Sequence, residues 1–455
     1  MFYKKIILSA ILLASPFTIV AQKLVHPTGI FAVSDSIDAA IEDDIYTLDY
    51  VDGVVLRYNW AILQPGKSTF NFAPVLSEIS KAKFYGKKVS LGIVCGAGIP
   101  HWIYDEGVTK LDFKEIPYQG ESDKVISFSM CAPWDKTYLK YFKDFITQLN
   151  SSLQADTSIY NNIVQVKVGG VNRYSLELAL PSEVNLTNGK DTSTNATEIW
   201  QSAGYRPYFV LDAFSQIVRH YRSVFKTKAL NIPFIPDPYS LPLIGSAGQA
   251  IGKNKQTLMA QLIDKSVVIA GNKLMVQWNA LNKNFVPVAL DSAMQNGAYG
   301  GLQISFKYYG NPPGDKSDSL MYLFDYAFAK NINYMELHCG TLRNLPEAAK
   351  YGYDLFHTRD GLITEDILVP HLYNNAPNPF VDFTYIKLTA KAPRKPMMQL
   401  FDCNGIFIRE VSPVKVDEYE YLYFISGENL PSGTYTVYVK VREKQLGMKI
   451  LKINK

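Results

Sequence analysis

An α/β barrel of eight strand–helix units, followed by a small all-β domain, is the fold class that the sequence predicts. Between Gly29 and Phe356, eight short apolar runs alternate with segments of helical spacing. After Pro370 the helical spacing stops, and short runs of alternating polar and apolar residues replace it. The first pattern indicates parallel strands covered by helices, and the second indicates antiparallel strands.

The predicted strands are short apolar runs, most of which lead into turn or polar residues. They cover 29–33, 54–56, 89–94, 164–168, 230–234, 274–278, 302–306 and 334–337. Apolar residues at helical spacing predict helices over 34–50, 75–86, 134–149, 210–224, 258–269, 289–297, 320–328 and 348–356. A doubly wound open sheet has the same alternation and is the rival architecture, although no G-x-G-x-x-G follows the first strand.

The sequence divides into three segments. Residues 1–21 are predicted to be a signal peptide, because Lys4 and Lys5 precede an apolar stretch that ends at Ala21. The barrel is expected over 22–368 and the all-β domain over 369–455. No later segment is long and apolar enough to cross a membrane, so we expect a secreted chain.

Charge and cysteine content narrow the function classes. A formal net charge of +4 on 455 residues, without a basic stripe, gives no case for nucleic acid. The four cysteines have no C-x-x-C spacing, and both disulfides and buried free thiols stay open. His101, His338 and His357 lack the spacing of zinc ligands, and no G-x-S-x-G is present. We expect neither a metal nor a cofactor.

The stretch from Val51 to Phe72 carries a functional pattern. A buried run ends in Arg57, Tyr58, Asn59 and Trp60, a composition that suits the rim of a sugar pocket better than a core. W-A-I-L-Q-P-G-K-S-T-F-N-F follows from Trp60. This resembles the second strand and loop of (β/α)₈ glycoside hydrolases of the clan with two catalytic glutamates, where W-x-x-L-[EQ]-P precedes G-x-[YF]-[DN]-[FW]. The plainer interpretation is a strand edge and turn of any α/β protein.

If the barrel prediction holds, the active site lies at the C-terminal ends of the strands. Trp60, Trp102 and Trp278 are then expected to stack on sugar rings. The full set of predicted substrate-binding residues is Arg57, Asn59, Trp60, His101, Trp102, Asn172, Tyr174, Trp278 and Tyr308.

Cleavage of a glycosidic bond needs two carboxyl groups that face the anomeric carbon. In the clan the acid/base stands at the end of strand four, usually directly after Asn, so the resemblance favours Glu177, five residues after Asn172. Glu183 is a nearby competitor. The alternative is that Glu177 forms a salt bridge with Arg173 at the rim.

The second carboxylate departs from the clan. In the clan, the nucleophile stands at the end of strand seven. This protein has Gln303 in that strand and no acid. Glu336 lies in the otherwise apolar strand eight, and a lone buried carboxylate is costly unless it is paired or functional. We therefore expect Glu336 to be the second carboxylate, with Arg57 holding it ionised. The alternative is a buried Glu336–Arg57 bridge without turnover.

The tail carries four motifs in order: P-N-P-F at 377–380, L-F-D-C-N-G at 400–405, L-P-S-G-T-Y at 430–435, and a Lys-rich end at 449–455. Together they resemble the type A sorting domain of the type IX secretion system. The resemblance implies that the secretion machinery is a partner, that the chain crosses the outer membrane, and that it becomes attached to the cell surface. A sugar-binding β-sandwich is the alternative. Either way, Asp402 and Gly405 are expected to form a hairpin turn.

Three functions follow. The first is an exported glycoside hydrolase that acts on a poly- or oligosaccharide, with Glu177 and Glu336 as catalytic carboxylates. The second is a non-catalytic, cell-surface, glycan-binding barrel, which Gln303 favours. The third is a surface protein without a sugar ligand, in which the rim aromatic residues are packed away.

Overall fold

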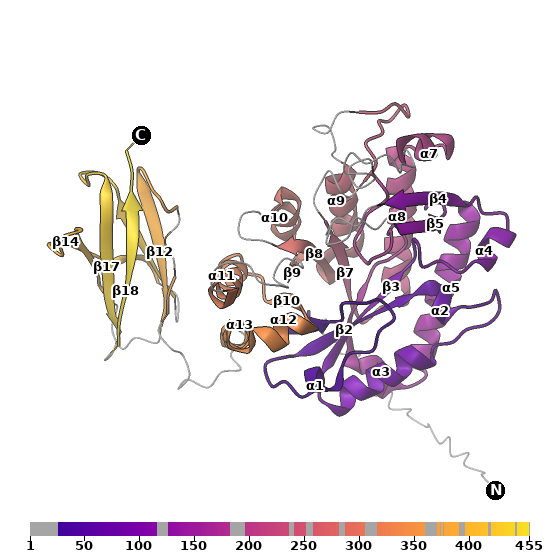
Figure 1. Ribbon diagram of the computed structural model, residues 1–455, viewed down its shortest axis with the longest axis horizontal. Helices are drawn as coiled ribbons and strands as arrows, with labels where there is room; N and C mark the ends of the chain where they lie inside the picture. The colour runs from indigo at the N-terminus through magenta and orange to yellow at the C-terminus, as the bar shows by residue number, and fades with distance from the viewer. Residues whose placement is uncertain are drawn as a thin grey trace, which may run out of the picture.

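Eight parallel strands close into a barrel in the order β1-β10-β9-β8-β7-β6-β3-β2, as the computed structural model shows (Figure 1). The structure describes residues 26–454 except 116–125, 183–195, 236–240, 252–257, 282–286, 305–315, 360–370, 374, 376, 391–395, 417–419 and 442–443. The barrel strands are β1 (Gly29–Val33), β2 (Gly53–Asn59), β3 (Lys88–Val94), β6 (Ile163–Lys167), β7 (Ala229–Phe234), β8 (Leu274–Leu281), β9 (Tyr299–Ile304) and β10 (Tyr334–His338). The predicted fold class is confirmed, and each predicted strand overlaps an observed one.

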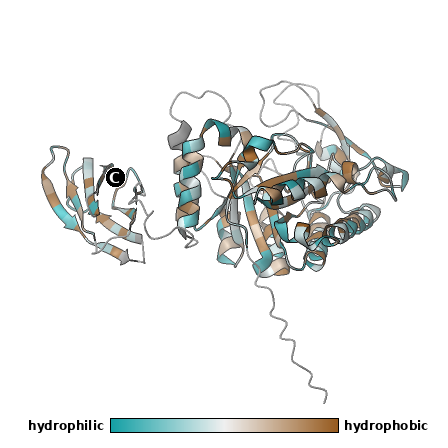
Figure 2. Ribbon diagram, turned by 90° about the horizontal axis from the view of Figure 1, so that it is seen from below, coloured by the Kyte–Doolittle hydropathy of each residue, from teal (hydrophilic) through white to brown (hydrophobic). Residues whose placement is uncertain are grey.

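Helices surround the barrel, and Figure 2 shows hydrophobic residues in the strands and hydrophilic residues on outward helix surfaces. The longer helices are α3 (Ala73–Phe84), α5 (Lys136–Gln154), α8 (Pro207–Val224), α9 (Leu258–Ala270), α10 (Val288–Gln295), α11 (Lys316–Ala329) and α13 (Pro346–Arg359). Short helices are α1 (Asp43–Tyr46), α2 (Trp60–Leu63), α4 (Trp102–Asp105), α6 (Thr157–Asn162), α7 (Ala196–Ser202), α12 (Cys339–Asn344) and the 3₁₀ turn η3 (Gly271–Lys273). Each long helix buries its apolar stripe against the strands, as helical periodicity requires.

The predicted helix over 34–50 is wrong for most of its length, since only α1 forms there. Asp38 has φ +63°, which a helix cannot accommodate. Its carboxylate instead accepts the backbone N–H of Asn59 at 2.7 Å and the Asn59 side-chain amide at 2.5 Å. These bonds fasten the segment after β1 to the end of β2.

The sequence also did not predict the antiparallel hairpin of β4 (Leu111–Glu115) and β5 (Ile126–Met130).

Two apolar cores belong to the barrel. The larger lies between the strands and the helices. The smaller lies inside the ring of strands and consists of Phe31, Val33, Val55, Met275 and Tyr334, with Val164 beside it. Barrel interiors are usually filled with layers of branched apolar side chains. Here the apolar part of the interior is small, and polar side chains take up many of the other inward positions.

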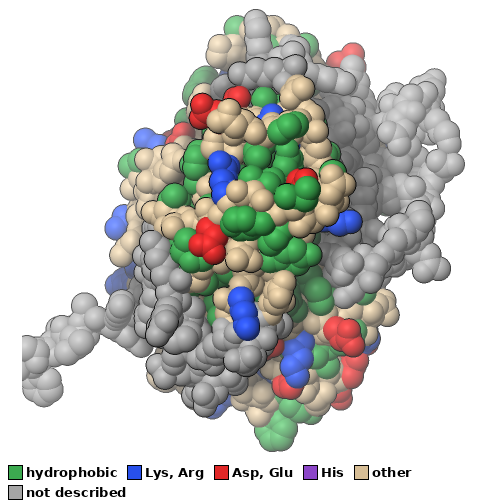
Figure 3. Space-filling model, turned by 90° about the vertical axis from the view of Figure 1, so that its left-hand side faces the viewer, with side chains coloured by type: hydrophobic (Ala, Val, Ile, Leu, Met, Phe, Trp, Pro, Cys, Tyr) green, Lys and Arg blue, Asp and Glu red, His purple; other side chains and the backbone are tan. Residues whose placement is uncertain are grey.

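The C-terminal part is a sandwich of two antiparallel sheets. One has the order β11 (His371–Leu372), β12 (Phe383–Thr389), β16 (Glu420–Ser426) and β15 (Pro413–Val416). The other has the order β14 (Phe407–Val411), β13 (Met398–Phe401), β17 (Gly433–Val441) and β18 (Lys444–Lys452). A separate core that includes Phe380, Leu400 and Val437 lies between them. On the outer face shown in Figure 3, apolar side chains lie among charged ones.

The turn after β13 has the expected form. The Asp402 carboxylate accepts the backbone N–H of Asn404 at 2.9 Å and that of Ile406 at 2.7 Å. Gly405 has φ +77°, a left-handed conformation that glycine adopts at no steric cost. The motif residues Asp402 and Gly405 therefore have a local structural role as a hairpin turn.

All four cysteines are free thiols; Cys95, Cys131 and Cys339 are buried and Cys403 is exposed. Within the described ranges, no helix combines the length and the apolar character that a membrane crossing requires.

Candidate functional site

An ion pair crosses the centre of the barrel. Lys167 Nζ on β6 lies 2.5 Å from Glu336 Oε1 on β10, and both side chains are 1% exposed. In the ring, β6 and β10 are separated by three strands on either side, so the pair joins opposite walls. The Tyr334 hydroxyl donates to the same Glu336 oxygen at 2.6 Å. Glu336 thus accepts from two donors and is closed off from solvent.

A chain of hydrogen bonds leads from this ion pair toward the C-terminal mouth. Lys167 Nζ donates to Gln277 Oε1 at 2.9 Å, and Asn231 Nδ2 donates to the same oxygen at 2.6 Å. Gln277 Nε2 then donates to Asn279 Oδ1 at 2.7 Å. Asn279 Nδ2 donates to Glu177 Oε1 at 2.8 Å. The two predicted carboxylates are therefore joined by one continuous series of contacts, the ion pair and three hydrogen bonds, through side chains of β6 and β8.

Glu177 is half-buried in the loop that follows β6. The loop is held in place by the buried Asn172, whose Nδ2 donates to the Leu176 carbonyl at 2.7 Å and to the Glu177 carbonyl at 3.2 Å. Burial alone would raise the pKa of Glu177, but hydrogen bonds from Ser175 and Asn279 and the charge of Arg57 outweigh it. The pKa is lowered overall, so Glu177 is an ionised carboxylate at neutral pH.

Arg57 stands near the end of β2 at the same mouth. Burial lowers the pKa of its guanidinium, and the negative charges of Glu177, Glu336 and Asp35 oppose that shift. One of its amino groups donates to the Ser34 carbonyl. Its Nε makes no hydrogen bond with any described residue. Arg57 is thus a half-buried cation within electrostatic reach of three carboxylates.

The expected ion pair of Glu336 with Arg57 is replaced by one with Lys167. Arg57 turns its amino group toward the loop after β1, where it meets the Ser34 carbonyl. Lys167 instead extends from the opposite wall and reaches the carboxylate directly. The charge of Arg57 still acts on the group at longer range.

A third carboxylate at the mouth was not among the predicted site residues. Asp35 follows β1, and its side chain is 53% exposed. Its Oδ1 lies 3.0 Å from Nδ1 of His338, the buried last residue of β10. His338 Nε2 lies 3.5 Å from the side-chain nitrogen of Gln303. Gln303 belongs to the strand at whose end the clan resemblance implies an acid. Asp35 falls in the segment 34–50 that the sequence predicts as a helix, and this prediction hid its place at the mouth.

The structure corrects the prediction that Trp60 and Trp278 stack on sugars. Trp60 is 0% exposed and lies 5.4 Å, between ring centroids, from both Phe142 and Phe145 of α5. Trp278 is 2% exposed and packs on Phe234, 5.4 Å away. Both belong to the large core between the strands and the helices. Trp60 opens α2, and Trp278 lies between Gln277 and Asn279, whose side chains join the hydrogen bonds inside the barrel, so Trp278 faces the opposite way.

The other predicted residues take varied positions. Trp102 is half-buried, and its indole N–H donates to the Gln64 carbonyl at 3.1 Å. His101 is exposed. The half-buried Tyr174 has Arg173 over its ring at 5.3 Å, so Arg173 is engaged there. Asn59 is half-buried and bonded to Asp38, as described above. Tyr308 and Glu183 lie outside the described residues.

Lys167, Gln277 and Asn231 were also missed by sequence reasoning. Lys167 carried the same signal as Glu336, a lone charge inside an apolar strand, in I-V-Q-V-K. A charge in one buried strand needs a charge of opposite sign in another, and the two could have been matched on that ground. Within the part of the chain that the structure describes, no group of three or more His, Cys, Asp or Glu side chains could hold a metal ion.

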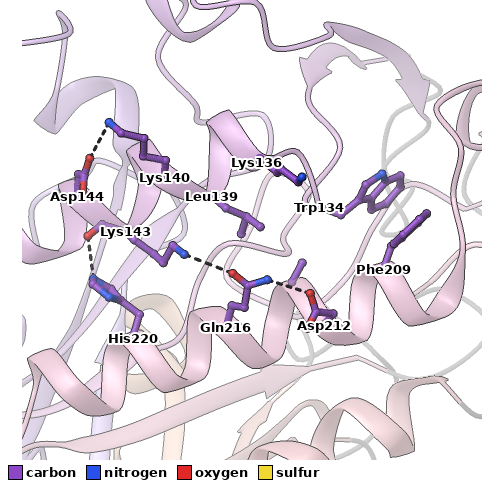
Figure 4. A pocket seen from close by; sticks show the side chains of 11 residues that line it. Trp134, Lys136, Leu139, Lys140, Lys143, Asp144, Phe209, Asp212, Gln216 and His220 are labelled. Carbon is purple, nitrogen blue, oxygen red and sulfur yellow. Dashed lines mark hydrogen bonds and ion pairs between the residues drawn. The ribbon is translucent and has the colours of Figure 1, made fainter.

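A hollow lies on the outside of the barrel, between α5 and α8, with a volume of about 850 Å³ (Figure 4). Its polar side chains bond one another. Lys143 reaches Gln216 at 3.4 Å, Gln216 donates to Asp212 at 2.9 Å, and Lys140 donates to Asp144 at 3.2 Å. Such mutual bonds are typical of the interface between two packed helices. The mouth of the barrel remains the candidate site.

No family model matches the chain, and no curated protein matches it in sequence. Solved structures do resemble it. An endo-β-1,4-mannanase from Thermotoga petrophila has 10% identity and a TM-score of 0.46, with 94% of this chain and 98% of that chain covered. A xylanase 10B from Thermotoga petrophila RKU-1 in complex with xylobiose has 11% identity and a TM-score of 0.40, with 73% and 94% covered.

A β-galactosidase from the psychrophilic Marinomonas ef1 has 10% identity and a TM-score of 0.44, with 73% of this chain and 60% of that chain covered. These structures are glycosidases by name. The likeness concerns the course of the chain, and the barrel assignment rests on the strand pairing given above.

Proposed function

We propose that the mouth of the barrel binds a poly- or oligosaccharide without cleaving it, with Glu177 as an ionised acceptor for sugar hydroxyl groups. The contrast between the two predicted carboxylates carries this proposal. Glu177 is half-buried and ionised at the mouth, whereas Glu336 is 1% exposed and bound to Lys167 and Tyr334. This difference in exposure supports a role of Glu177, rather than Glu336, in meeting a ligand.

Hydrolysis by two carboxyl groups needs one protonated donor and a second group that reaches the anomeric carbon or its water. The lowered pKa of Glu177 disfavours the protonated form that a general acid must supply at neutral pH. Glu336 is held by its ion pair in the barrel interior. Arg57, whose charge acts on Glu177, and Asn279, which donates to it, are polar neighbours of the kind that orient a sugar.

A glycan array probed with the chain lacking residues 1–21 tests the proposal, followed by measurement of released reducing ends for each bound glycan. We expect binding without release, and loss of binding in Glu177→Gln. Glu410→Gln, an exposed carboxylate in the sandwich, is the matched control and should bind normally. If no glycan binds to the unaltered chain, the proposal is wrong.

Glycoside hydrolysis by Glu177 and Glu336 is the second candidate. Two observations favour it: the charges of both carboxylates act on the guanidinium of Arg57, and a continuous series of hydrogen bonds joins them. This candidate requires reducing ends to be released by the unaltered chain and release to stop in both Glu177→Gln and Glu336→Gln. Release that persists in Glu336→Gln would remove Glu336 from a catalytic role.

We also propose that the chain is exported across the outer membrane by the type IX secretion machinery, which recognises the sandwich. The four tail motifs and their order along the chain support this. Removal of residues 369–455 should leave the barrel in the periplasm, measured by immunoblotting of cell fractions. Surface display of that truncated chain would contradict the proposal.

A further inference from the structure

The hydrogen-bond chain from Lys167 to Glu177 has a fixed direction. A lysine ammonium can only donate, and an ionised carboxylate can only accept. The two amides between them, Gln277 and Asn279, can each be turned by 180° with little change of shape. Their orientation is therefore set by the groups at the two ends of the chain.

The orientation of Gln277 follows from its two donors. Lys167 Nζ at 2.9 Å and Asn231 Nδ2 at 2.6 Å both approach one atom, which must be the amide oxygen. The Gln277 nitrogen then faces Asn279 Oδ1 at 2.7 Å, and this leaves Asn279 Nδ2 to face Glu177 at 2.8 Å. A cation at the centre of the barrel thus determines that a donor is offered to the carboxylate at its mouth.

We propose that Lys167 is a positioning residue, which through Gln277 and Asn279 holds the Glu177 carboxylate in its ionised, hydrogen-bond-accepting form. The inference deepens the proposed function and rests on it, because Glu177 is the group that would meet the glycan. Lys167 itself is 1% exposed and does not touch a ligand.

Glu336 is the counter-charge in this arrangement. Burial lowers the pKa of Lys167, and the neighbouring Glu336 is the main influence that opposes this shift. Without the carboxylate, the amine would tend to lose its proton and could then accept as well as donate. A buried ion pair seldom adds net stability, since several kcal/mol of hydration are lost per ion. A role in fixing orientation explains why this chain keeps one inside its barrel.

The test compares the titration of Glu177 in variants of the full chain. The double variant Lys167→Met/Glu336→Gln removes both buried charges, so the direct effects of these charges on Glu177 largely cancel. Carbon-13 NMR of chain labelled at the glutamate carboxyl carbon, with the signal assigned by Glu177→Gln, gives the titration midpoint. We expect the midpoint to rise in the double variant by up to about one pH unit, because Asn279 keeps its amide group and loses only the partner that fixes its orientation.

Two further variants keep the test decisive. Gln277→Met interrupts the series of hydrogen bonds and leaves the Lys167–Glu336 ion pair in place, so it should raise the titration midpoint of Glu177 equally. If the double variant does not fold, Gln277→Met alone tests the role of Lys167. Lys228→Met is the matched control, because Lys228 is also buried and bonds the Tyr160 carbonyl at 2.6 Å, outside the hydrogen-bond chain. In Lys228→Met, the titration midpoint of Glu177 should equal that in the unaltered chain.

An unchanged midpoint in the folded double variant or in Gln277→Met overturns the inference, whatever the glycan array shows. The titration is recorded without glycan, so it does not depend on the proposed function. A raised midpoint together with a blank array supports the role of Lys167 and rejects the proposed function. A raised midpoint together with at least tenfold weaker glycan binding supports both.

Discussion

At the scale of single residues, Glu177 and Glu336 have the same side chain and different roles because their partners differ. Glu177 accepts hydrogen bonds from uncharged donors, including Asn279, and remains half-buried at the mouth. Glu336 is neutralised by Lys167 inside the barrel. A hydrogen-bonded carboxylate near a surface can meet a ligand, whereas one paired in the interior fixes its neighbours.

The lowered pKa of Glu177 makes folding stability depend on pH. Its unfolded pKa is about 4.3. Because the folded pKa is lower, Glu177 stabilises the native state above pH ~4.3, and this contribution disappears as the pH falls through the folded pKa. Glu177→Gln should reduce the free energy of unfolding at pH 7 by about 1 kcal/mol and have less effect near pH 3. Urea denaturation at both pH values measures this, and an equal loss at both would contradict it.

Substitution of Trp60 tests whether this ring serves the core or the ligand. Because the ring is fully buried against α5, Trp60→Ala should lower the free energy of unfolding by about 3–5 kcal/mol. Glycan affinity per folded molecule should not change. Chemical denaturation and calorimetric binding measure the two effects. Normal stability with lost binding would show that the ring serves the ligand after all.

At the scale of elements, two loops form the part of the mouth that carries Glu177. The loop after β3 meets the loop after β6 at Gly96, where an added Cβ would lie 1.9 Å from the Arg173 carbonyl oxygen. The Ala97 N–H donates to that same oxygen at 2.6 Å. The close approach of two backbones needs a residue without a side chain.

Gly96→Ala should therefore displace the loop after β6 and weaken glycan binding about tenfold or more, since the Arg173 carbonyl cannot move independently of Glu177's loop. Gly433→Ala is the control, because no atom lies within 4 Å of the added methyl group and its φ is not in the left-handed region. Isothermal titration of the two variants gives the comparison. Equal affinities would show that the loop position does not matter.

The sequence predicted the strands better than the site. The run 54–56 is apolar on both faces because both sides of a barrel strand are covered, and that pattern is visible locally. Trp60 was misplaced because the side on which a residue faces changes within one position at the end of β2. Lys167 was missed because its partner lies on the opposite wall, and only closure of the ring brings the two together.

At the scale of the whole molecule, the barrel and the sandwich have separate cores. Figure 1 shows the sandwich to one side of the barrel, with its own two sheets. Separate cores predict separate cooperative units, because each buries its own apolar surface. The division of labour that we propose, binding by the barrel and export by the sandwich, requires this independence.

Calorimetry of the full chain should accordingly show two unfolding transitions. Phe380 is 0% exposed in the sandwich core, so Phe380→Ala should destabilise that unit by about 3–5 kcal/mol and lower only one transition. Trp60→Ala should lower only the other. A single transition that moves with either substitution would contradict independent units.

The most direct test of the central claim is a calorimetric titration at pH 7 with a glycan found on the array, followed by chromatography of the recovered glycan. We expect the unaltered chain to bind the glycan and return it intact, and Glu177→Gln to bind it at least tenfold more weakly. Recovery of shortened glycan from the unaltered chain, and of intact glycan from Glu336→Gln, would contradict the account and make Glu336 a catalytic carboxylate.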